Sequence, residues 1–322
     1  MKAHKETFLS FVQKHANSKL VIASHSNVDL DALSSAYAVK SVFPKAILAF
    51  PEKMDSPAQS FCEHMDIEYK AIEKLKPADY DGLVVVDCST YVLLKEAKAW
   101  KGKVLLIIDH HHKSETAIEG KENIRDEDAK STAEIVSTLL PSFTPDVAFA
   151  LSVAIISDTA RFKSGKPSTF VELARMLEIS GKDYREALEF AEPELELDKK
   201  ASVLEAFKLM HISIRSGYTI ATVEVPAHES LISSSISEFA DVAFAANWRG
   251  EAKETRVSSR ARKCVPVMLN EVMAQVASEY RGSGGGHPKA AGCSAKEKPA
   301  KVLERCVEVL AEKLEAFHSS EK

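Results

Sequence analysis

The chain has 322 residues, of which 45% are hydrophobic and 28% are charged, and its formal net charge is −5. This balance is typical of a globular protein with enough residues for roughly two domains, and it excludes a disordered chain. The acidic net charge argues against a protein that coats nucleic-acid duplexes, but local basic patches leave a nucleic-acid substrate open.

The five cysteines are scattered and never form a C-x-x-C pair, which excludes a disulfide framework and a zinc ribbon. The amino-terminal stretch MKAHKETFLSFVQKHANSK is mixed and amphipathic, unlike a secretory signal. No apolar run reaches the length of a membrane span. We therefore expect a cytoplasmic protein with no membrane partner.

Four continuous Val/Ile/Leu runs predict strands of a parallel sheet that is buried on both faces. They are Lys19–Ser24, Ala46–Phe50, Gly82–Asp87 and Lys103–Asp109. Helical spacing of apolar residues follows or separates them, in the stretches DALSSAYAVKSVF, STAEIVSTLL and DVAFALSVAIISDTARF. This alternation predicts an α/β domain, a parallel sheet with helices on both faces.

The character of the chain changes after about residue 182, where a charged helical stretch is interrupted by Pro193. The strand-like segments YTIATVEV, DVAFAANWRG and ETRVSSRA follow, then a glycine-rich loop, GSGGGHPKAAG, and a closing helix, PAKVLERCVEVLAEKLEAF. We predict a catalytic domain over 1–190, a helical connector over 191–205 and a smaller α/β domain over 206–322.

Three of the predicted strands and one predicted helix of the first domain end in side chains that bind metals. They are His25, Asp29 and Asp31 in HSNVDLD, Asp87 in VVVDCS, Asp109, His110 and His111 in IIDHHH, and Asp158 in SDT. The carboxyl ends of parallel strands meet at one edge of a sheet, so these segments are expected to converge. Taken singly, most of them also suit a turn or a helix cap, as Asp29 does before its helix.

Several carboxylates in one cleft resist ionising together unless a cation compensates them. Bound divalent metals provide that cation, and mixed carboxylate and imidazole ligands suit Mn²⁺, with Mg²⁺, Fe²⁺ and Co²⁺ open. The number of ligands exceeds what one ion requires. We therefore predict two divalent metal ions that polarise a phosphoryl group and activate a water.

The second domain contains residue types that bind phosphate. In the glycine-rich loop, Gly285 and Gly286 let backbone N–H groups approach an anion, and His287 and Lys289 add charge or hydrogen bonds. A flexible glycine turn is the alternative. Upstream, three alternating residues would share one face of a strand, and arginine suits phosphate oxygens. These residues are Arg256, Ser258 and Arg260; a solvated charged strand is the alternative for them.

The motifs HSNVDLD, VVVDCS, DHH and SDT resemble, in order, the four motifs of the DHH phosphoesterase superfamily. GGGHPKAAG resembles the signature loop of the DHH-associated C-terminal domain. With only these two domains, the chain is most similar to nanoRNase/pAp-phosphatase-type proteins, which are related to RecJ. It departs from the pattern by a third histidine, His112, which leaves the register of the histidine run ambiguous by one position.

The resemblance implies a role for each motif residue. His25 and Asp29 would hold one metal, the other would be held by Asp31, His110 and Asp158, and Asp87 would bridge them. Asp109 would support the site, and His111 would contact the substrate or the leaving oxygen. The role of His112 is left open, with the absence of a role as the hypothesis to test. The second domain would close over the nucleotide, with the active-site cleft between the domains. Arg161, just beyond Asp158, is expected to stabilise charge on the phosphoryl oxygens.

The expected function is metal-dependent hydrolysis of short single-stranded oligonucleotides to 5′-mononucleotides, with pAp as a further substrate. A cyclic dinucleotide phosphodiesterase and a single-strand exonuclease of the RecJ type are the enzymatic alternatives. A pyrophosphatase is disfavoured, because the glycine-rich domain suits a nucleotide better. A nucleotide-binding regulatory protein is the non-enzymatic alternative, and a homodimer is left open.

Overall fold

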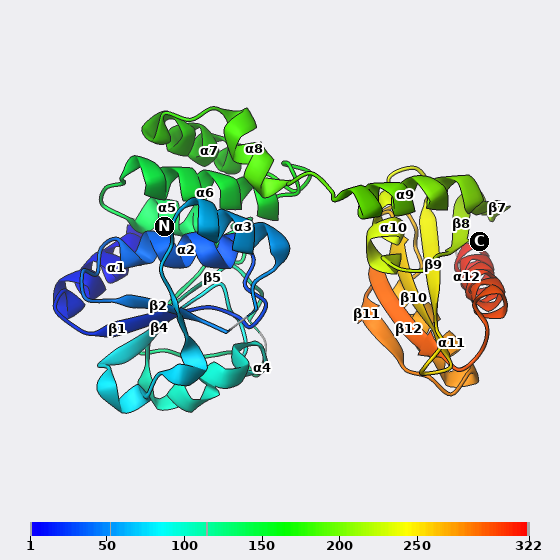
Figure 1. Ribbon diagram of the computed structural model, residues 1–322, viewed down its shortest axis with the longest axis horizontal. Coiled ribbons are helices and arrows are strands. Elements are labelled where there is room, and N and C mark those ends of the chain that lie inside the picture. The colour runs from blue at the N-terminus through cyan, green and yellow to red at the C-terminus, as the bar shows by residue number, and fades with distance from the viewer. Residues whose placement is uncertain (1, 52, 114, 321–322) are drawn as a thin grey trace. The chain divides into compact units, whose positions relative to one another are not determined.

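The computed structural model of the chain describes residues 2–51, 53–113 and 115–320. The chain divides into two compact units, Met1–Glu194 and Leu195–Lys322, and each is described by itself (Figure 1). The predicted connector 191–205 spans this division. Its second half belongs to helix α9 (Leu197–Leu209), the first helix of the second unit.

The described part of the first unit contains a six-stranded parallel sheet in the order β3-β2-β1-β4-β5-β6. Four strands match the predicted apolar runs: β1 (Leu20–Ala23), β2 (Ile47–Phe50), β4 (Gly82–Val86) and β5 (Val104–Asp109). The two strands at the edges, β3 (Lys70–Ala71) and β6 (Glu122–Arg125), were not predicted. The parallel α/β architecture is confirmed.

The two faces of this sheet are covered differently (Figure 1). One face packs against a large apolar core to which most of the helices contribute. These are α1 (Lys2–His15), α2 (Leu30–Lys40), α3 (Ser56–His64), α5 (Thr132–Leu139), α6 (Pro145–Asp158), α7 (Pro167–Ser180) and α8 (Tyr184–Ala191). The other face packs against the short helix α4 (Tyr91–Leu94) and the 3₁₀ segments η1 (Ile72–Lys74) and η3 (Lys95–Lys103). A further 3₁₀ segment, η2 (Pro77–Asp79), has no buried residue.

The second unit contains a mixed sheet in the order β11-β12-β10-β9-β8-β7. Its strands are β7 (His211–Arg215), β8 (Tyr218–Glu224), β9 (Val242–Arg249), β10 (Glu254–Ala261), β11 (Gly284–His287) and β12 (Ala290–Ala295). Helices α9 and α10 (Glu229–Ile236) contribute to the core on one face. On the other face lie α11 (Leu269–Glu279) and α12 (Pro299–Ser320).

The glycine-rich segment is a β-hairpin, so the prediction of a loop was wrong. Strands β11 and β12 pair antiparallel around Pro288 and Lys289. A Cβ at Gly284 would lie 2.2 Å from the carbonyl oxygen of Met273 in α11, so glycine lets β11 approach that helix closely. Gly286, with a φ of +131°, turns the end of the strand in a conformation that other residues disfavour.

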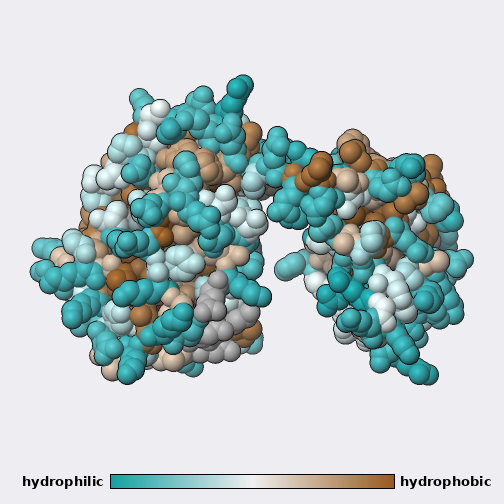
Figure 2. All heavy atoms as spheres, viewed as in Figure 1, coloured by the Kyte–Doolittle hydropathy of each residue, from teal (hydrophilic) through white to brown (hydrophobic). Residues whose placement is uncertain are grey.

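The surface in view is largely hydrophilic in both units (Figure 2). Among the helices of the described residues, none combines the length and the apolar character that a membrane crossing requires. All five cysteines are free thiols, and only Cys264 is exposed.

Candidate metal centre and arginine-lined pocket

The first group of candidate ligands comes from the segment after β1 and the segment after β4. His25 Nε2 lies 3.6 Å from Asp29 Oδ2 and 3.3 Å from Asp87 Oδ2. The three residues each offer one ligand atom, and these atoms lie within 4.8 Å of one another. Asp29 also caps α2, because its Oδ1 accepts the backbone N–H of Ala32 at 3.0 Å. Asp29 can therefore cap the helix with one oxygen and offer the other oxygen to a metal.

A second group lies beside the first and shares Asp87 with it. His110 Nε2 lies 3.5 Å from Asp87 Oδ1 and 3.5 Å from Asp158 Oδ2 at the end of α6. Asp31, His110 and Asp158 form one compact set of ligand atoms, and Asp87, His110 and His111 form another. One oxygen of Asp87 thus faces His25 while the other faces His110. The structure brings all six predicted metal ligands into this cluster.

Burial and repulsion act on the carboxyl groups of the cluster. Burial, followed by the charges of Asp87 and Asp29, raises the pKa of Asp158 to about 7. Burial also raises the pKa of Asp31 well above its usual value, and the charges of Asp87 and Asp158 add to this. Burial alone would lower the pKa of His25, but hydrogen bonds with Asp29 and Asp87 outweigh it and raise this pKa to about 10.

The donor set fits divalent cations. Four carboxylates crowd around histidines whose protons only partly neutralise them, and a divalent ion would relieve the repulsion that raises the pKa of Asp158 and Asp31. Oxygen and imidazole ligands without thiolates are those of Mn²⁺ and Mg²⁺ sites more than of structural zinc sites.

Helix α5 holds Asp31 in place through its amino terminus. The backbone N–H groups of Thr132 and Ala133 donate to the Asp31 carboxylate at 2.7 and 2.8 Å, and Ser35 Oγ donates at 3.3 Å. Thr132 Oγ1 also donates to Asp87 Oδ1 at 2.8 Å. Helix N-termini favour negative charge, so α5 orients two of the candidate ligands at once. The sequence reasoning missed this role of α5.

Asp109 belongs to none of the candidate ligand groups among the described residues, and it orients His111. It is fully buried, and it accepts hydrogen bonds from Arg125 Nη1 at 2.7 Å and from His111 Nδ1 at 2.8 Å. The hydrogen bond with Asp109 raises the pKa of His111, against the effect of burial. Arg125, which the sequence reasoning also missed, supplies the cation that makes the buried carboxylate tolerable.

Two residues of these motifs are engaged elsewhere in the structure. His112 Nδ1 lies 2.8 Å from Glu127 Oε2, and its side chain is 89% exposed, outside the ligand groups. Arg161 Nε lies 2.5 Å from Glu192 Oε1. The Arg161 guanidinium, which we expected to stabilise charge on phosphoryl oxygens, is thus paired with Glu192 in this structure.

The backbone near two of the candidate ligands adopts an unusual conformation. Asp87 has a φ of +51°, and three successive residues after Asp158, namely Ala160, Arg161 and Phe162, have φ values of +47°, +57° and +66°. Non-glycine residues rarely adopt positive φ, and such strain concentrates at functional sites.

The second unit contains a pocket of about 790 Å³ that is lined by residues of β10, of the hairpin β11–β12 and of the start of α10. Arg256, Ser258, Arg260 and Gly285 line it, as predicted for a shared face. Arg260 donates to Ser230 Oγ at 3.3 Å, and the buried Ser258 hydroxyl bonds Ser233 Oγ at 3.0 Å. Within the described residues, Arg256 has no ion-pair partner, so its guanidinium is available to an anion.

Three other predicted substrate residues of the glycine-rich motif, Gly286, His287 and Lys289, are not among the residues that line this pocket. His287 is exposed at the end of β11, and Gly286 precedes it. The ammonium group of Lys289 donates to the carbonyl oxygens of Val265 and Val267. Lys289 thus ties the hairpin to the segment before α11 and points away from the predicted phosphate contact.

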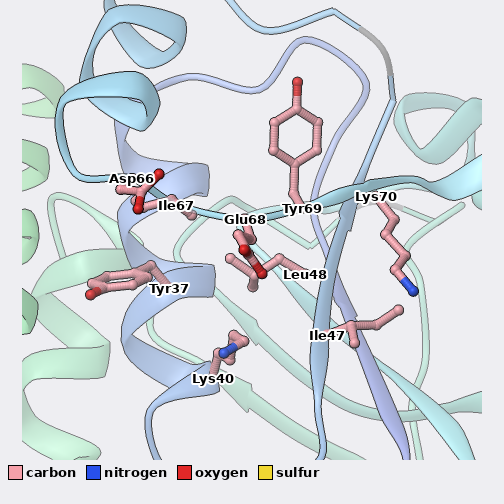
Figure 3. Close-up of a pocket in the computed structure, with 9 residues that line it drawn as sticks. All are labelled: Tyr37, Lys40, Ile47, Leu48, Asp66, Ile67, Glu68, Tyr69 and Lys70. Atoms are coloured by element: carbon pink, nitrogen blue, oxygen red, sulfur yellow. The ribbon is translucent and has the colours of Figure 1, made fainter.

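A separate hollow of about 620 Å³ lies on the first unit, away from the candidate ligands (Figure 3). It is lined by Ile47 and Lys70, which begin β2 and β3, and by Tyr37 and Lys40 near the end of α2. The candidate ligands instead follow the carboxyl ends of strands and the start of α2. The hollow therefore lies where the parallel strands begin, whereas the candidate ligands lie where they end.

The DHH family, N-terminal domain, matches residues 19–157, and the DHHA1 domain matches residues 230–317. An uncharacterized protein of Methanocaldococcus jannaschii is 31% identical over 308 residues, which cover 90% of this chain and 91% of that protein.

Two solved structures share the fold at low sequence identity. An exopolyphosphatase-related protein from Bacteroides fragilis is 14% identical with a TM-score of 0.78, over 99% of this chain and 98% of that chain. RecJ in complex with Mn²⁺ from Thermus thermophilus is 15% identical with a TM-score of 0.52, over 98% of this chain and 55% of that chain. Together with the two domain matches, the relative at 31% identity shows that this chain belongs to the DHH phosphoesterase family, with a DHHA1 domain after the DHH domain.

Proposed function

We propose that this chain hydrolyses short single-stranded oligonucleotides with two divalent metal ions and releases 5′-mononucleotides, and that it also acts on pAp. Membership of the DHH family supports the coarser activity, hydrolysis of phosphate esters. The observation that carries the two-metal proposal is the position of Asp87, whose two oxygens face His25 and His110 from one carboxylate.

In the proposal, His25 and Asp29 would hold one ion, and Asp31, His110 and Asp158 would hold the other, with Asp87 contributing to both groups. Mn²⁺ suits this mixed set of ligands best, while Mg²⁺ and Co²⁺ are alternatives. When bound, the two ions supply the positive charge that polarises a phosphoryl group and lowers the pKa of water.

His111 is proposed to provide a proton to the leaving oxygen. Its Nδ1 is held by Asp109, which leaves Nε2 free to face a substrate. The hydrogen bond with Asp109 raises the pKa of His111, so the ring keeps its proton closer to neutral pH. Asp109 and Arg125 are positioning residues in this scheme.

The arginine-lined pocket is proposed to bind a phosphate of the same substrate. Arg256 offers a guanidinium without an ion-pair partner among the described residues, and Arg260 lies on the same face of β10. Planar guanidinium groups suit phosphate oxygens. A Cβ at Gly285 would meet nothing within 4 Å, so this glycine leaves the floor of the pocket open for a ligand.

A product profile tests the proposal. Purified protein with Mn²⁺ or with a chelator would be given pAp, linear and cyclic dinucleotides, and 5-mers and 24-mers of RNA and DNA. Metal-dependent release of 5′-mononucleotides from the short linear substrates is the expected result. Preference for a cyclic dinucleotide or for 24-mers would favour the alternative enzymes, and binding without hydrolysis would favour a regulatory protein.

Replacement of Arg256 tests the pocket against a matched control. Arg256→Ala should raise KM for a dinucleotide about tenfold or more, because a charge-assisted phosphate contact is lost. Arg215→Ala removes an exposed arginine from β7, at the opposite edge of the same sheet, and should leave KM unchanged. Equal effects of both replacements would refute the proposed pocket.

A further inference from the structure

The short helix α4 presents two aliphatic side chains to solvent close to the candidate metal centre. Val92 is 67% exposed and Leu93 is 44% exposed, whereas Leu94 on the inner side is fully buried. Val92 and Val171 are the most exposed aliphatic residues among those described in the first unit. Of these two residues, Val92 follows the candidate ligand Asp87 closely in the sequence, whereas Val171 lies on α7.

Backbone hydrogen bonds connect helix α4 and the residues before it to neighbouring segments of the first unit. Ser26, the residue after His25, donates its backbone N–H to the carbonyl oxygen of Leu93 at 2.8 Å. At the other end, Ile118 donates its backbone N–H to the carbonyl oxygen of Ser89 at 2.9 Å. The chain reaches α4 directly from Asp87. Val92 and Leu93 therefore follow Asp87 closely in the chain, on a helix that is hydrogen-bonded to the residue after His25.

We infer that Val92 and Leu93 form an apolar ledge on which the sugar and base next to the reacting phosphate rest. This inference rests on the proposed function and names the part of the substrate that the ledge recognises. In a nucleotide, the sugar and base are joined to the phosphorus through an ester oxygen. A phosphate bound at the metal centre would therefore bring the sugar and base of its nucleotide to the neighbouring surface, where we place the ledge. Burying apolar surface on both sides stabilises the complex without reading the identity of the base.

The ledge separates two substrate classes that the metal chemistry alone does not distinguish. An inorganic polyphosphate contains no apolar surface, so it gains nothing from Val92 and Leu93. A nucleotide gains the burial of its sugar and base. The ledge thus favours nucleotide substrates through contacts that contain no charge.

The test is a cycle of two changes, one in the protein and one in the substrate. The protein change is Val92→Thr with Leu93→Asn, which keeps the shape of both side chains and replaces their apolar ends. The substrate change is from a linear dinucleotide to an analogue that lacks one base. In the unmodified protein the abasic analogue should have a KM about tenfold higher, and in the double variant this difference should disappear.

Two measurements distinguish the loss of the ledge from a general disturbance of the structure or of the metal centre. The double variant should keep its Mn²⁺ affinity and its inhibition constant for inorganic tripolyphosphate, because neither probe has an apolar part. Val171→Thr, a matched change on α7, should alter neither KM nor these constants. A higher inhibition constant for tripolyphosphate in the double variant, or an abasic analogue that binds the unmodified protein as well as the full dinucleotide, would overturn the inference.

Failure of the proposed function has a different signature. If the unmodified protein cleaves tripolyphosphate but no oligonucleotide or pAp, the nucleotide function itself is wrong and the ledge has no such substrate. If it cleaves the dinucleotide and the double variant has the same KM, only the ledge is wrong.

Discussion

Asp87 meets several structural demands in a single residue. Its two oxygens face two histidines, one of these oxygens also accepts the hydroxyl of Thr132, and its φ of +51° is unusual outside glycine. The backbone N–H of Asp87 donates to Ile108 at 2.9 Å, which anchors the strained residue to the neighbouring strand. The surrounding sheet therefore maintains a backbone conformation that would be unfavourable in isolation.

Asp87→Asn should lower metal-dependent hydrolysis by at least about a hundredfold, because changes behind a metal ligand already cost 10–100-fold. The amide keeps the acceptor for Thr132, so the thermal midpoint of the metal-free protein should change little. Circular dichroism and an assay with Mn²⁺ measure the two quantities. A variant with full activity would refute the shared role of Asp87.

Arg125→Met should lower the free energy of unfolding by about 3 kcal/mol, since it leaves the fully buried Asp109 without its cation. Arg161→Met breaks a more exposed pair with Glu192 and should change it by less than about 1 kcal/mol. Urea unfolding with a chelator present measures both values. Similar losses in the two variants would contradict the difference in burial.

Metal affinity should increase with pH, because metal and protons compete for the same atoms. In the metal-free protein the pKa of Asp158 is raised to about 7 and that of His25 to about 10, so below these values each group holds a proton that a metal must displace. Mn²⁺ affinity should then rise about tenfold per pH unit for each displaced proton. Calorimetry in two buffers with different ionisation enthalpies counts the released protons; affinity that is constant between about pH 6 and pH 8 would contradict this.

At the scale of elements, long apolar runs were sufficient to predict β1, β2, β4 and β5. The edge strands β3 and β6 contain mainly exposed polar side chains, and β3 has only two residues, so neither formed an apolar run that could be recognised. The hairpin β11–β12 was taken for a loop because glycine has low strand propensity. Its close approach to α11, visible only in three dimensions, is what requires glycine there.

The candidate ligands could be predicted from sequence, whereas the groups that hold them could not. Asp31 is fixed by the backbone N–H groups of Thr132 and Ala133, which follow it by 101 and 102 residues. Every residue type except proline has a backbone N–H donor, so such a contact leaves almost no trace in the sequence. Lys289 shows that a suitable residue type can also mislead. Lysine often binds phosphate, but here its ammonium group donates to the carbonyl oxygens of Val265 and Val267.

Two adjacent glycines of β11 should respond differently to alanine. A Cβ at Gly284 would meet the Met273 backbone at 2.2 Å, so Gly284→Ala should lower the thermal midpoint of the second unit. Gly285→Ala should keep that midpoint, because its Cβ meets nothing within 4 Å, and should raise KM by narrowing the pocket. Thermal melts with dinucleotide kinetics test both; a destabilised Gly285→Ala or a stable Gly284→Ala would contradict the geometry.

At the scale of the whole molecule, the two units have separate apolar cores. Calorimetry of the full chain should therefore show two unfolding transitions. Mn²⁺ at about a hundred times its Kd should stabilise only the unit with the candidate ligands, by about 2.7 kcal/mol. Gly284→Ala should shift only the other transition. A single transition that moves as a whole in both experiments would show that the cores unfold together.

The turn after Asp158 bears on how this chain can change during evolution. Glycine normally destabilises a fold, because it increases the freedom of the unfolded chain. At Ala160, Arg161 and Phe162 that penalty is opposed by the about 1–2 kcal/mol that each L-residue loses in a left-handed conformation. Substitution by glycine is therefore favoured most at Ala160, whose side chain is only a methyl group. At the next two positions it would also remove a contact, because Arg161 pairs with Glu192 and Phe162 stacks on Phe170 with ring centroids 4.5 Å apart.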